Sequence, residues 1–370
     1  MKNLSLLILT LMSIVENFSC TVPTDKMIVW DQLPIIPDST GFAGSFAGVS
    51  NGSLIVAGGS NFPANTRPWS GGTKTWYDNI FVLENPKSNW KEIGKLPRPM
   101  GYGVSLTWKD GVIILGGADK DKHYAECYFI RYVNDSIVTE QLPDLPAPNA
   151  NASGVIINDI IYVAGGLASP TAKETLNVFW SLDLSKPVMH RNWKVLITWP
   201  GPSRMLAVAG SMNDEFYLMS GVHLAVATDD TAAHREYLKD AYAYTPGNGW
   251  KKISDLPYST AAAPGPSYAS QELGLLVIGG DDGSRADSNT ILKDKHPGFR
   301  TGILAYHNND WSPVSEVLTK KMPDPENNPN GSTWASVTTP LVIWNGDIII
   351  PGGEVRPGVR TNRVLRATLK

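Results

Sequence analysis

The chain repeats one pattern of apolar and polar positions six times. Each repeat contains an apolar run that ends in two small residues, usually Gly-Gly, and the runs are Leu54–Gly59, Val112–Gly117, Ile161–Gly166, Phe216–Gly221, Leu275–Gly280 and Ile348–Gly353. The last glycines of successive runs lie 49 residues (117 to 166) to 73 residues (280 to 353) apart. A period of this length indicates that each repeat is one supersecondary unit.

Each repeat predicts four short β-strands. A segment of small residues precedes the apolar run, an alternating stretch follows it, and a segment led by Trp completes the repeat, as in Trp90–Pro97, Trp193–Pro200 and Trp250–Pro257. Alternation indicates strands, and the intervening Asn, Asp, Gly and Pro indicate turns. The Gly pair permits positive φ where the second strand ends. The Trp is large enough to wedge between neighbouring sheets. Four-stranded sheets at this period predict a β-propeller.

The two ends of the chain predict how the ring closes. After the last apolar run only one strand remains, Thr361–Leu369, and a Trp-containing segment of the missing kind lies at the other end as Met27–Pro34. The N-terminal strand should therefore complete the C-terminal blade, which removes exposed sheet edges. We expect an all-β, six-bladed propeller; the alternative is an unrelated all-β fold with chance Gly pairs.

Composition adds little to this picture except at the N-terminus. The net charge of −3 and the lack of a basic stripe give no sign of nucleic acid binding. Residues 1–20 resemble a secretory signal peptide, and the Ser19-Cys20 pair resembles a lipoprotein signal, so Cys20 is a candidate for lipidation and membrane attachment. We expect an exported protein, in a bacterial periplasm or on the outer membrane, with one propeller domain over residues 21–370. Cys127 alternates within a predicted strand and is expected to be a small core residue.

The loops after the second and fourth strands should open on one face, because neighbouring strands in a blade are antiparallel. These loops are long and chemically varied, which marks the working side. The candidates for contact with an anionic substrate are Asn61, Arg67, Arg204, Arg235 and Arg300. Each of these residues has an alternative role. Asn61 could cap the turn after Gly59, and each Arg could be a loop residue that is solvated or ion-paired. His234 and Glu236 are candidates for a proton donor, and Asp281-Asp282-Gly283 is either a calcium loop or a solvated turn.

Two motifs carry a resemblance to a known family. The segment Pro351–Thr361 (PGGEVRPGVRT) resembles the G-G-E-x-[KR]-P-G-x-R-T segment of the bacterial N-acetylneuraminate epimerases, the sialic acid mutarotases, and Gly58–Pro63 (GGSNFP) resembles their G-G-x-N-F-P. Members of that family are exported six-bladed propellers of Kelch type. The Glu/Arg motif lies at the C-terminus here, so the order of blades resembles that of a cyclically permuted branch. The resemblance implies interconversion of α and β N-acetylneuraminate, with Glu354 and Arg360 as the catalytic pair.

The chemistry of mutarotation suits these residue types. A base takes the anomeric hydroxyl proton while an acid protonates the ring oxygen, and a carboxylate such as Glu354 can be the base. Arg360 lies six residues further on, across the Pro357-Gly358 turn, and an Arg can hold the carboxylate of a sugar acid through two hydrogen bonds. No metal or organic cofactor is expected, and the six His are scattered. The alternative for the pair is a surface ion pair that stiffens a tight loop.

Other functions remain open for a propeller, because fold does not settle function. The main alternative is a non-catalytic Kelch propeller that binds a glycan or a protein. A sialidase is disfavoured because its S-x-D-x-G-x-T-W boxes are missing from the sequence. A copper radical oxidase is disfavoured because the His are dispersed and Cys127 is expected in the core.

Overall fold

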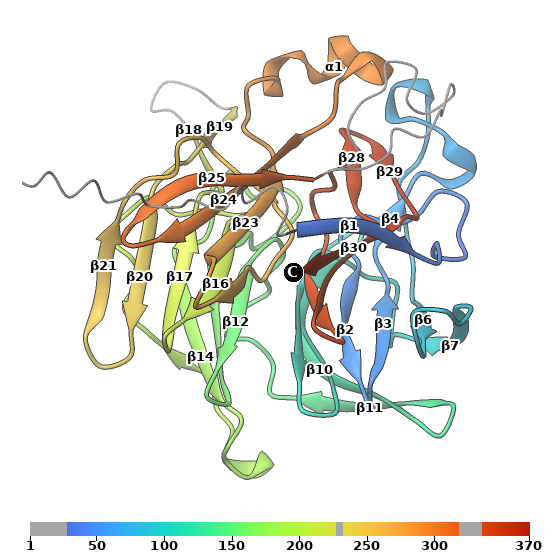
Figure 1. The fold of residues 1–370 in the computed structure, drawn as a ribbon, viewed down its shortest axis with the longest axis horizontal. Coiled ribbons are helices and arrows are strands. Elements are labelled where there is room, and N and C mark those ends of the chain that lie inside the picture. Colours follow the sequence, from blue (N-terminus) through green and yellow to red (C-terminus); the bar gives the residue numbers. More distant parts are fainter. Residues whose placement is uncertain (1–27, 227–231, 318–334) are drawn as a thin grey trace, which may run out of the picture.

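The six apolar runs form the second strands of six four-stranded antiparallel sheets (Figure 1). The structure is a computed structural model that describes residues 28–226, 232–317 and 335–370. The predicted signal peptide and Cys20 lie outside the described residues. The sheets are the blades of a six-bladed β-propeller, as the repeat predicted.

The blades are numbered in chain order, and each is given from its inner strand to its outer strand. Blade 1 contains β2 (Phe46–Ser50), β3 (Ser53–Ala57), β6 (Asn79–Leu83) and β7 (Lys91–Lys95). Blade 2 contains β8 (Val104–Trp108), β9 (Gly111–Ala118), β10 (His123–Val133) and β11 (Ser136–Leu142). Blade 3 contains β12 (Ser153–Ile157), β13 (Ile160–Ala164), β14 (Phe179–Asp183) and β15 (Lys194–Val195).

The second half of the ring follows the same plan. Blade 4 contains β16 (Val208–Met212), β17 (Glu215–Met219), β20 (Ala241–Thr245) and β21 (Gly249–Ile253). Blade 5 contains β22 (Tyr268–Ser270), β23 (Gly274–Gly280), β24 (Arg300–His307) and β25 (Asp310–Glu316). Blade 6 contains β26 (Val342–Trp344), β27 (Asp347–Pro351), β30 (Val364–Leu369) and β1 (Ile28–Leu33).

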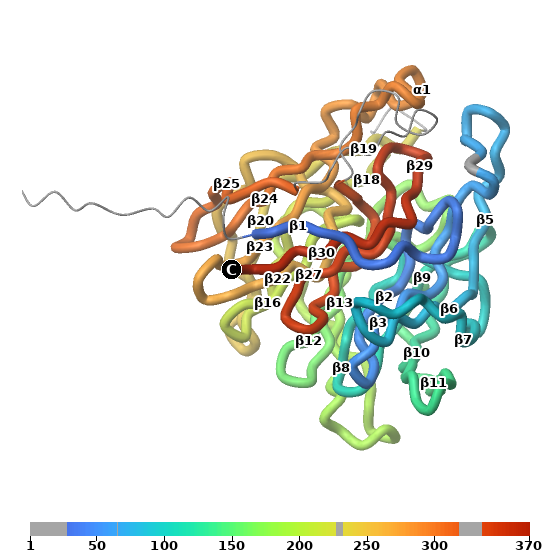
Figure 2. The backbone as a smooth tube through the Cα atoms, turned by 45° about the vertical axis from the view of Figure 1, so that its right-hand side comes forward, coloured from blue at the N-terminus to red at the C-terminus, as the bar shows by residue number. Residues whose placement is uncertain are grey.

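The segments between second and third strands carry the remaining elements, except for the turn Val188–His190, which lies between the third and fourth strands of blade 3. Three are hairpins, formed by β4 (Ser60–Asn61) with β5 (Thr75–Trp76), β18 (Val222–Val226) with β19 (Ala233–Tyr237), and β28 (Glu354–Arg356) with β29 (Val359–Arg360). Short helical turns are Pro63–Asn65, Pro68–Ser70, Val188–His190, Ala286–Ser288, α1 (Asn289–Leu292) and Lys293–Lys295. The labels of β18, β19, β29 and α1 lie together at one end of the molecule in Figure 2. In three blades the sequence predicted loops where the structure has hairpins.

The N-terminal strand closes the ring, as the sequence predicted. Strand β1 pairs antiparallel with β30, in a register that places Trp30 opposite Ala367 and Leu33 opposite Val364. The two strands run side by side in Figures 1 and 2. The indole Nε1 of Trp30 also donates to the Glu316 carbonyl of blade 5 at 3.1 Å. The first described residues therefore join the last blade to its neighbour.

Tryptophan side chains fasten neighbouring blades to one another. In four further cases the indole Nε1 donates to a backbone carbonyl of the preceding blade or of the segment that follows it, at 2.7 to 2.9 Å: Trp90 to Pro34, Trp193 to Pro143, Trp250 to Ile197 and Trp311 to Ser254. A buried indole N–H needs such a partner. The outer strand of blade 2 has no Trp, and there Ile137 packs against the inter-blade core beside Gly94 of blade 1. The predicted wedge is confirmed for the Trp-led segments.

The hydrophobic core is divided among the six blade interfaces. Each of six buried clusters combines residues of two neighbouring blades; one joins Ile55 and Ile80 of blade 1 to Ile114 and Ile130 of blade 2. Both faces of each sheet are therefore covered, which is why the second strands read as continuous apolar runs. Cys127 is fully buried in one of these clusters, as predicted, and burial raises the pKa of its thiol to about 12. Among the described residues, no helix has the length and apolar character needed to cross a bilayer.

The Gly pairs have the conformation that the sequence required. All six pairs, including Ser220-Gly221 of blade 4, have positive φ at both residues. In blade 3 these values are +66° at Gly165 and +112° at Gly166, and a Cβ on Gly165 would lie 2.3 Å from the carbonyl oxygen of Arg204. The backbone that leads into blade 4 therefore passes directly over the Gly pair of blade 3.

One predicted strand is much shorter than expected. The segment Trp193–Pro200 contributes only the two residues of β15 to its sheet. Trp199 turns inward and is 2% exposed, whereas Val195 and Ile197 face solvent. Because the large indole is buried, the rest of the segment does not continue the β-ladder with β14, and the outer strand of blade 3 is short.

Candidate active site

A closed ring of six backbone hydrogen bonds surrounds the propeller axis. One residue from the segment before each inner strand takes part, and its N–H donates to the carbonyl of its counterpart in the preceding blade at 2.7 to 2.8 Å. The members are Gly44, Tyr102, Asn151, Leu206, Ala262 and Thr338, and Gly44 donates to Thr338 to close the ring. We call this set the axial ring. All six have positive φ, between +54° and +67°.

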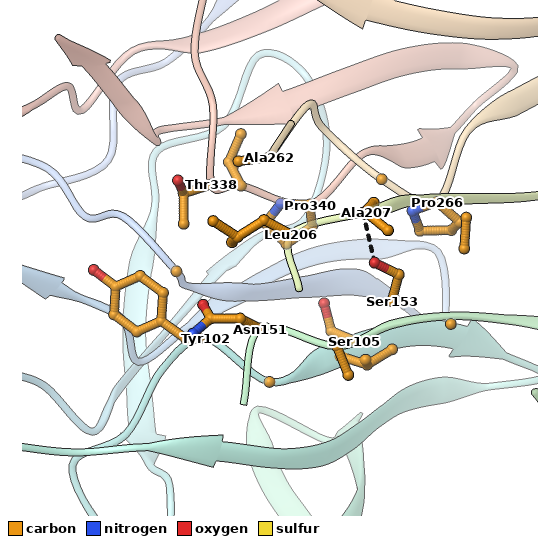
Figure 3. A pocket seen from close by; sticks show the side chains of 18 of the residues that line it. Tyr102, Ser105, Asn151, Ser153, Leu206, Ala207, Ala262, Pro266, Thr338 and Pro340 are labelled. Atoms are coloured by element: carbon orange, nitrogen blue, oxygen red, sulfur yellow. Dashed lines mark hydrogen bonds between the residues drawn. The ribbon is translucent and has the colours of Figure 1, made fainter. Parts of the chain in front are cut away.

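The axial ring separates two cavities. A narrow channel of about 100 Å³ on one side is lined by small residues such as Ser45, Ser105 and Gly154. In Figure 3 the labelled members of the ring lie toward the left of the residues that line this channel, and the Tyr102 side chain points away from the Ser105, Ser153 and Pro266 side chains. On the other side lies a wider cavity of about 490 Å³, which we call the funnel. Its volume falls within the roughly 300–1,000 Å³ of small-molecule sites.

The funnel is built by the two sets of loops that the sequence placed on one face. Segments after second strands supply Phe62, Lys74, Leu167, Arg235 and Glu354, and segments before inner strands supply four members of the axial ring, Tyr102, Asn151, Leu206 and Thr338. The polar part of its wall consists of Lys74, Tyr102, Asn151, Arg235, Thr338, Glu354 and Arg360. Among the described residues, three cations and one carboxylate give this wall a net positive charge at neutral pH, which favours an anionic ligand.

Glu354 and Arg360 are opposite each other on the β28–β29 hairpin. Glu354 follows the Gly pair of blade 6, and its backbone pairs with Val337 beside the axial ring. Arg360 Nη1 donates to Glu354 Oε1 at 3.1 Å, and the Gly358 N–H donates to the same oxygen at 2.6 Å. The Arg360 side chain is 4% exposed and that of Glu354 is 20% exposed. The carboxylate therefore reaches the funnel while its partner is held behind it.

Tyr102 and Lys74 complete this corner of the funnel, and the sequence analysis missed both. The Tyr102 hydroxyl lies 2.8 Å from Ser60 Oγ, and Lys74 Nζ lies over the Tyr102 ring, 4.2 Å from its centroid. The charges of Lys74 and Arg360 both act on the phenol. The available signal was the Gly101-Tyr102-Gly103 segment directly before an inner strand, where the repeat places residues on the axis.

The charges around Tyr102 change its acidity. Burial by itself raises the pKa of the phenol, but Lys74 and Arg360 favour the phenolate and outweigh both burial and the opposing charge of Glu354. The net result is a pKa of Tyr102 below its ordinary value. Glu354 and Tyr102 in turn raise the pKa of Arg360, so this guanidinium stays charged despite its burial.

Arg204 does not face the funnel, although we expected it to contact substrate. Its guanidinium is completely buried and donates to both carboxylate oxygens of Asp240 at 2.9 and 2.8 Å and to the Ser220 carbonyl at 2.9 Å. The rings of Trp199 and Tyr242 flank it at 5.4 and 5.5 Å. Arg204 lies two residues before Leu206 of the axial ring, and its backbone packs against the Gly pair of blade 3. This position in the repeat directs the side chain into the core.

Three other predicted contacts are also engaged by the protein. Asn61 is buried, donates to Asp38 Oδ1 at 3.2 Å and accepts from the Tyr77 hydroxyl at 2.8 Å, so its side chain joins two other segments of the chain. Arg67 forms an ion pair with Asp294 at 3.3 Å. Arg300 forms one with Asp282 at 2.7 Å and stacks on Tyr258. None of these three side chains belongs to the described wall of the funnel.

Arg235 is the member of the predicted group that does line the funnel. It lies on β19 with an exposed side chain, whereas His234 and Glu236 on either side of it do not line the cavity.

Asp281 occupies the position after the Gly pair in blade 5 that Glu354 occupies in blade 6. Burial raises the pKa of Asp281, and its carboxylate accepts from the Tyr237 hydroxyl and the Gly283 N–H, both at 3.0 Å. The Asp281–Gly283 segment is thus a turn closed by its own side chain.

Fold and site together define a closed six-bladed β-propeller with a basic funnel, whose described wall carries one carboxylate, Glu354. The family model of N-acetylneuraminate epimerase matches residues 17–138 and 142–370. The chain therefore belongs to the N-acetylneuraminate epimerase family, as the two sequence motifs implied.

Individual relatives match over shorter stretches. The chain is 37% identical over 102 residues to N-acetylneuraminate epimerase 1 of Escherichia coli O6:H1, covering 25% of this chain and 27% of that protein. It is 32% identical over 131 residues to the N-acetylneuraminate epimerase of Haemophilus influenzae strain 86-028NP, covering 32% and 34%. The chain thus spans about a third or less of the length of these relatives. The solved structure of YjhT superposes with a TM-score of 0.62 at 16% identity, over 91% of this chain and 97% of that one, which shows a shared fold.

Proposed function

We propose that this protein is a sugar mutarotase that interconverts the α and β anomers of N-acetylneuraminate. The observation that carries the proposal is the Glu354–Arg360 pair, because a carboxylate is held at the wall of a basic funnel by a cation buried behind it. The family to which the chain belongs supports the same reaction.

Glu354 is the base in this proposal. Oε1 accepts hydrogen bonds from Arg360 and Gly358, which fix the carboxylate and leave Oε2 available for a proton of the substrate. The carboxylate takes the proton of the anomeric hydroxyl as the bond from the anomeric carbon to the ring oxygen breaks and the open-chain ketone forms. Rotation about the neighbouring carbon–carbon bond presents the other face of the ketone, and the reverse steps close the ring. General base catalysis of this kind contributes roughly 10² to 10⁴ in rate.

The other cations of the funnel suit the substrate carboxylate. N-acetylneuraminate carries this group on its anomeric carbon, so the anion must be held next to the reacting bond. Arg235 offers an exposed planar guanidinium, which can bind a carboxylate through two parallel hydrogen bonds, and Lys74 offers a second positive charge on the funnel wall. Phe62, Leu167, Met205 and Leu224 supply apolar surface for the carbon skeleton and the acetyl group.

The test is equilibration of freshly released α-N-acetylneuraminate, followed by proton NMR with and without the purified protein. We expect the wild-type protein to accelerate it and Glu354→Gln to lose about 100-fold or more of that acceleration. The substitution keeps the size of the side chain and leaves an oxygen to accept from Gly358, so circular dichroism and the melting temperature serve as controls for folding. No acceleration by the wild-type protein would favour a non-catalytic propeller that binds a glycan or a protein.

We further propose that the protein is exported to a bacterial periplasm. The apolar stretch Leu4–Val15 after Lys2 supports this proposal, and Ser19-Cys20 supports a lipid on Cys20. Mass spectrometry of the mature N-terminus tests both parts: a chain that begins at a diacylglyceryl-modified Cys20 is expected, and an intact Met1 would refute export through this signal.

A further inference from the structure

Mutarotation requires a second proton-transfer group, which the Glu354–Arg360 pair does not supply. When the anomeric hydroxyl loses its proton to one group, the ring oxygen must gain one from another as its bond to carbon breaks. Arg360 is a poor donor because its guanidinium stays charged. The second group must therefore be another titratable side chain on the funnel wall, within one sugar ring of Glu354.

We propose that Tyr102 is this second proton-transfer group, a residue that donates its phenolic proton to the ring oxygen as the sugar opens and takes it back as the sugar closes. This inference rests on the mutarotase function proposed above. Tyr102 lines both the funnel and the channel beneath it, and it shares the funnel wall with Glu354 and Arg360. Arg360 binds Glu354 directly, and its charge also acts on the phenol.

The phenol is held in place by backbone and side-chain contacts. Its backbone N–H donates to Gly44 and its carbonyl accepts from Asn151, both at 2.7 Å, within the axial ring. Its ring packs against Gly44 so closely that a Cβ there would lie 2.7 Å from Tyr102 Cδ1. A group positioned in this way by a rigid element loses little freedom when substrate arrives, which is what proton transfer requires.

The surroundings stabilise the phenolate that donation leaves behind. The charged groups facing the phenol are Lys74 from the segment before β5, Arg360 from β29 and Glu354 from β28. The two cations outweigh the single carboxylate, in line with the lowered pKa of Tyr102. Ser60 Oγ accepts from the phenol or donates to the phenolate across the same 2.8 Å contact, so both protonation states have a partner.

The proton balance closes without any co-reactant. As the ring opens, the proton of the anomeric hydroxyl goes to Glu354, and the electron pair of that O–H bond forms the C=O bond of the ketone. The electron pair of the broken C–O bond stays on the ring oxygen. This oxygen then takes the proton of Tyr102. In closing, the phenolate removes this proton from the hydroxyl as the oxygen attacks the other face of the ketone. Glu354 then returns its proton to the anomeric oxygen, and both side chains regain their initial states.

No other acidic side chain in the described part of the chain is placed as well. Asp281 has a raised pKa, but its carboxylate already accepts from Tyr237 and Gly283 and it does not line the funnel. His234 and Glu236 lie on β19 outside the cavity wall. Tyr102 alone among these candidates belongs to the wall of the funnel.

The test compares Tyr102→Phe with wild type in the NMR equilibration assay. The variant keeps the ring and loses the hydroxyl, so we expect kcat to fall about 100-fold or more and KM to change about threefold or less. Tyr132→Phe is the matched control, because that phenol binds Glu84 and Asp135 on the outside of blade 2, and its activity should equal that of wild type. Undiminished kcat in Tyr102→Phe with an active wild type would overturn this inference and leave the mutarotase proposal standing. An inactive wild type would overturn both.

A pH profile distinguishes proton transfer from a merely structural role of Tyr102. Activity of the wild type should fall on the alkaline side as the phenol ionises, at a pH below 10. Lys74→Met removes one of the two cations that favour the phenolate, so this alkaline limb should move to higher pH. A limb that stays in place in Lys74→Met would refute the assignment.

Discussion

Replacement of Arg204 by Met tests whether this residue stabilises the fold or binds substrate. The side chain is completely buried, and its guanidinium makes hydrogen bonds to Asp240, Ser220 and Pro202. Met fills much of the same volume but leaves the Asp240 carboxylate without its cation. The Tyr242 hydroxyl, which donates to Asp240 at 2.8 Å, would remain as a partner.

The expected loss follows from this burial. Removal of one partner of a buried ion pair costs about 3–5 kcal/mol, because the other charge is left uncompensated. Urea unfolding followed by circular dichroism should show this decrease in the free energy of unfolding. Arg366→Met is the matched control: its partners Asp31 and Asp347 are both in contact with solvent, so the loss there should be about 1 kcal/mol or less.

A second variant separates charge from packing. Arg204→Met combined with Asp240→Asn removes both charges and should regain about 1–3 kcal/mol of the loss, since replacing both members of a buried pair is far less damaging than replacing one. Activity at a temperature where the variant is folded should remain within about threefold of wild type. A variant that keeps its stability within about 1 kcal/mol but raises KM tenfold would show that Arg204 contacts substrate, and would refute the reasoning.

Three further outcomes are expected from the fold. Gly165→Ala should lower the free energy of unfolding by about 2 kcal/mol or more in urea titrations, because its φ is +66° and the new Cβ would meet the Arg204 carbonyl; an unchanged midpoint would contradict this. A chain that begins at residue 34 lacks β1 and exposes the edge of β30, so it should self-associate in size-exclusion chromatography, and a stable monomer would argue against closure by β1. The Cys127 thiol should be inert to a thiol reagent at pH 8 until the chain unfolds, because its pKa is about 12. As the folded pKa exceeds the unfolded one, stability should fall as the pH rises from about 9 to 12, and rapid labelling of the native protein would refute its burial.

The ring of blades was predictable because the repeat constrains every level of structure at once. The Gly pairs mark the end of each second strand, and the structure gives all of them the positive φ that the sequence suggested. The Trp-led segments indicated both the fourth strands and the contact between neighbouring sheets. Strand lengths were less predictable. In blade 3 the large indole of Trp199 is buried, and this tertiary preference overrides the alternating pattern that predicted a longer strand.

The funnel was only partly predictable from the sequence. Glu354, Arg360 and Arg235 line it, since they belong to the variable segments after second strands, where the topology places ligand contacts. Arg204 was misjudged because a buried Arg and an exposed one look the same in a sequence, and only its position relative to the Gly pair of blade 3 shows that it faces inward. Tyr102 and Lys74 were missed because they belong to no recognised motif. Lys74 comes from blade 1 and Tyr102 from the segment that leads into blade 2, so only the folded structure shows that the two side chains are in contact.

The axial ring has a consequence for how this molecule could be redesigned. Every member donates its amide hydrogen to a neighbour, so main-chain atoms close the annulus while the side chains differ from one member to the next. Gly44 has no room for a side chain, because a Cβ there would lie 2.7 Å from Tyr102 Cδ1. The side chains of Asn151, Leu206, Ala262 and Thr338 are the ones whose exchange should change what the protein accepts while the scaffold stays the same.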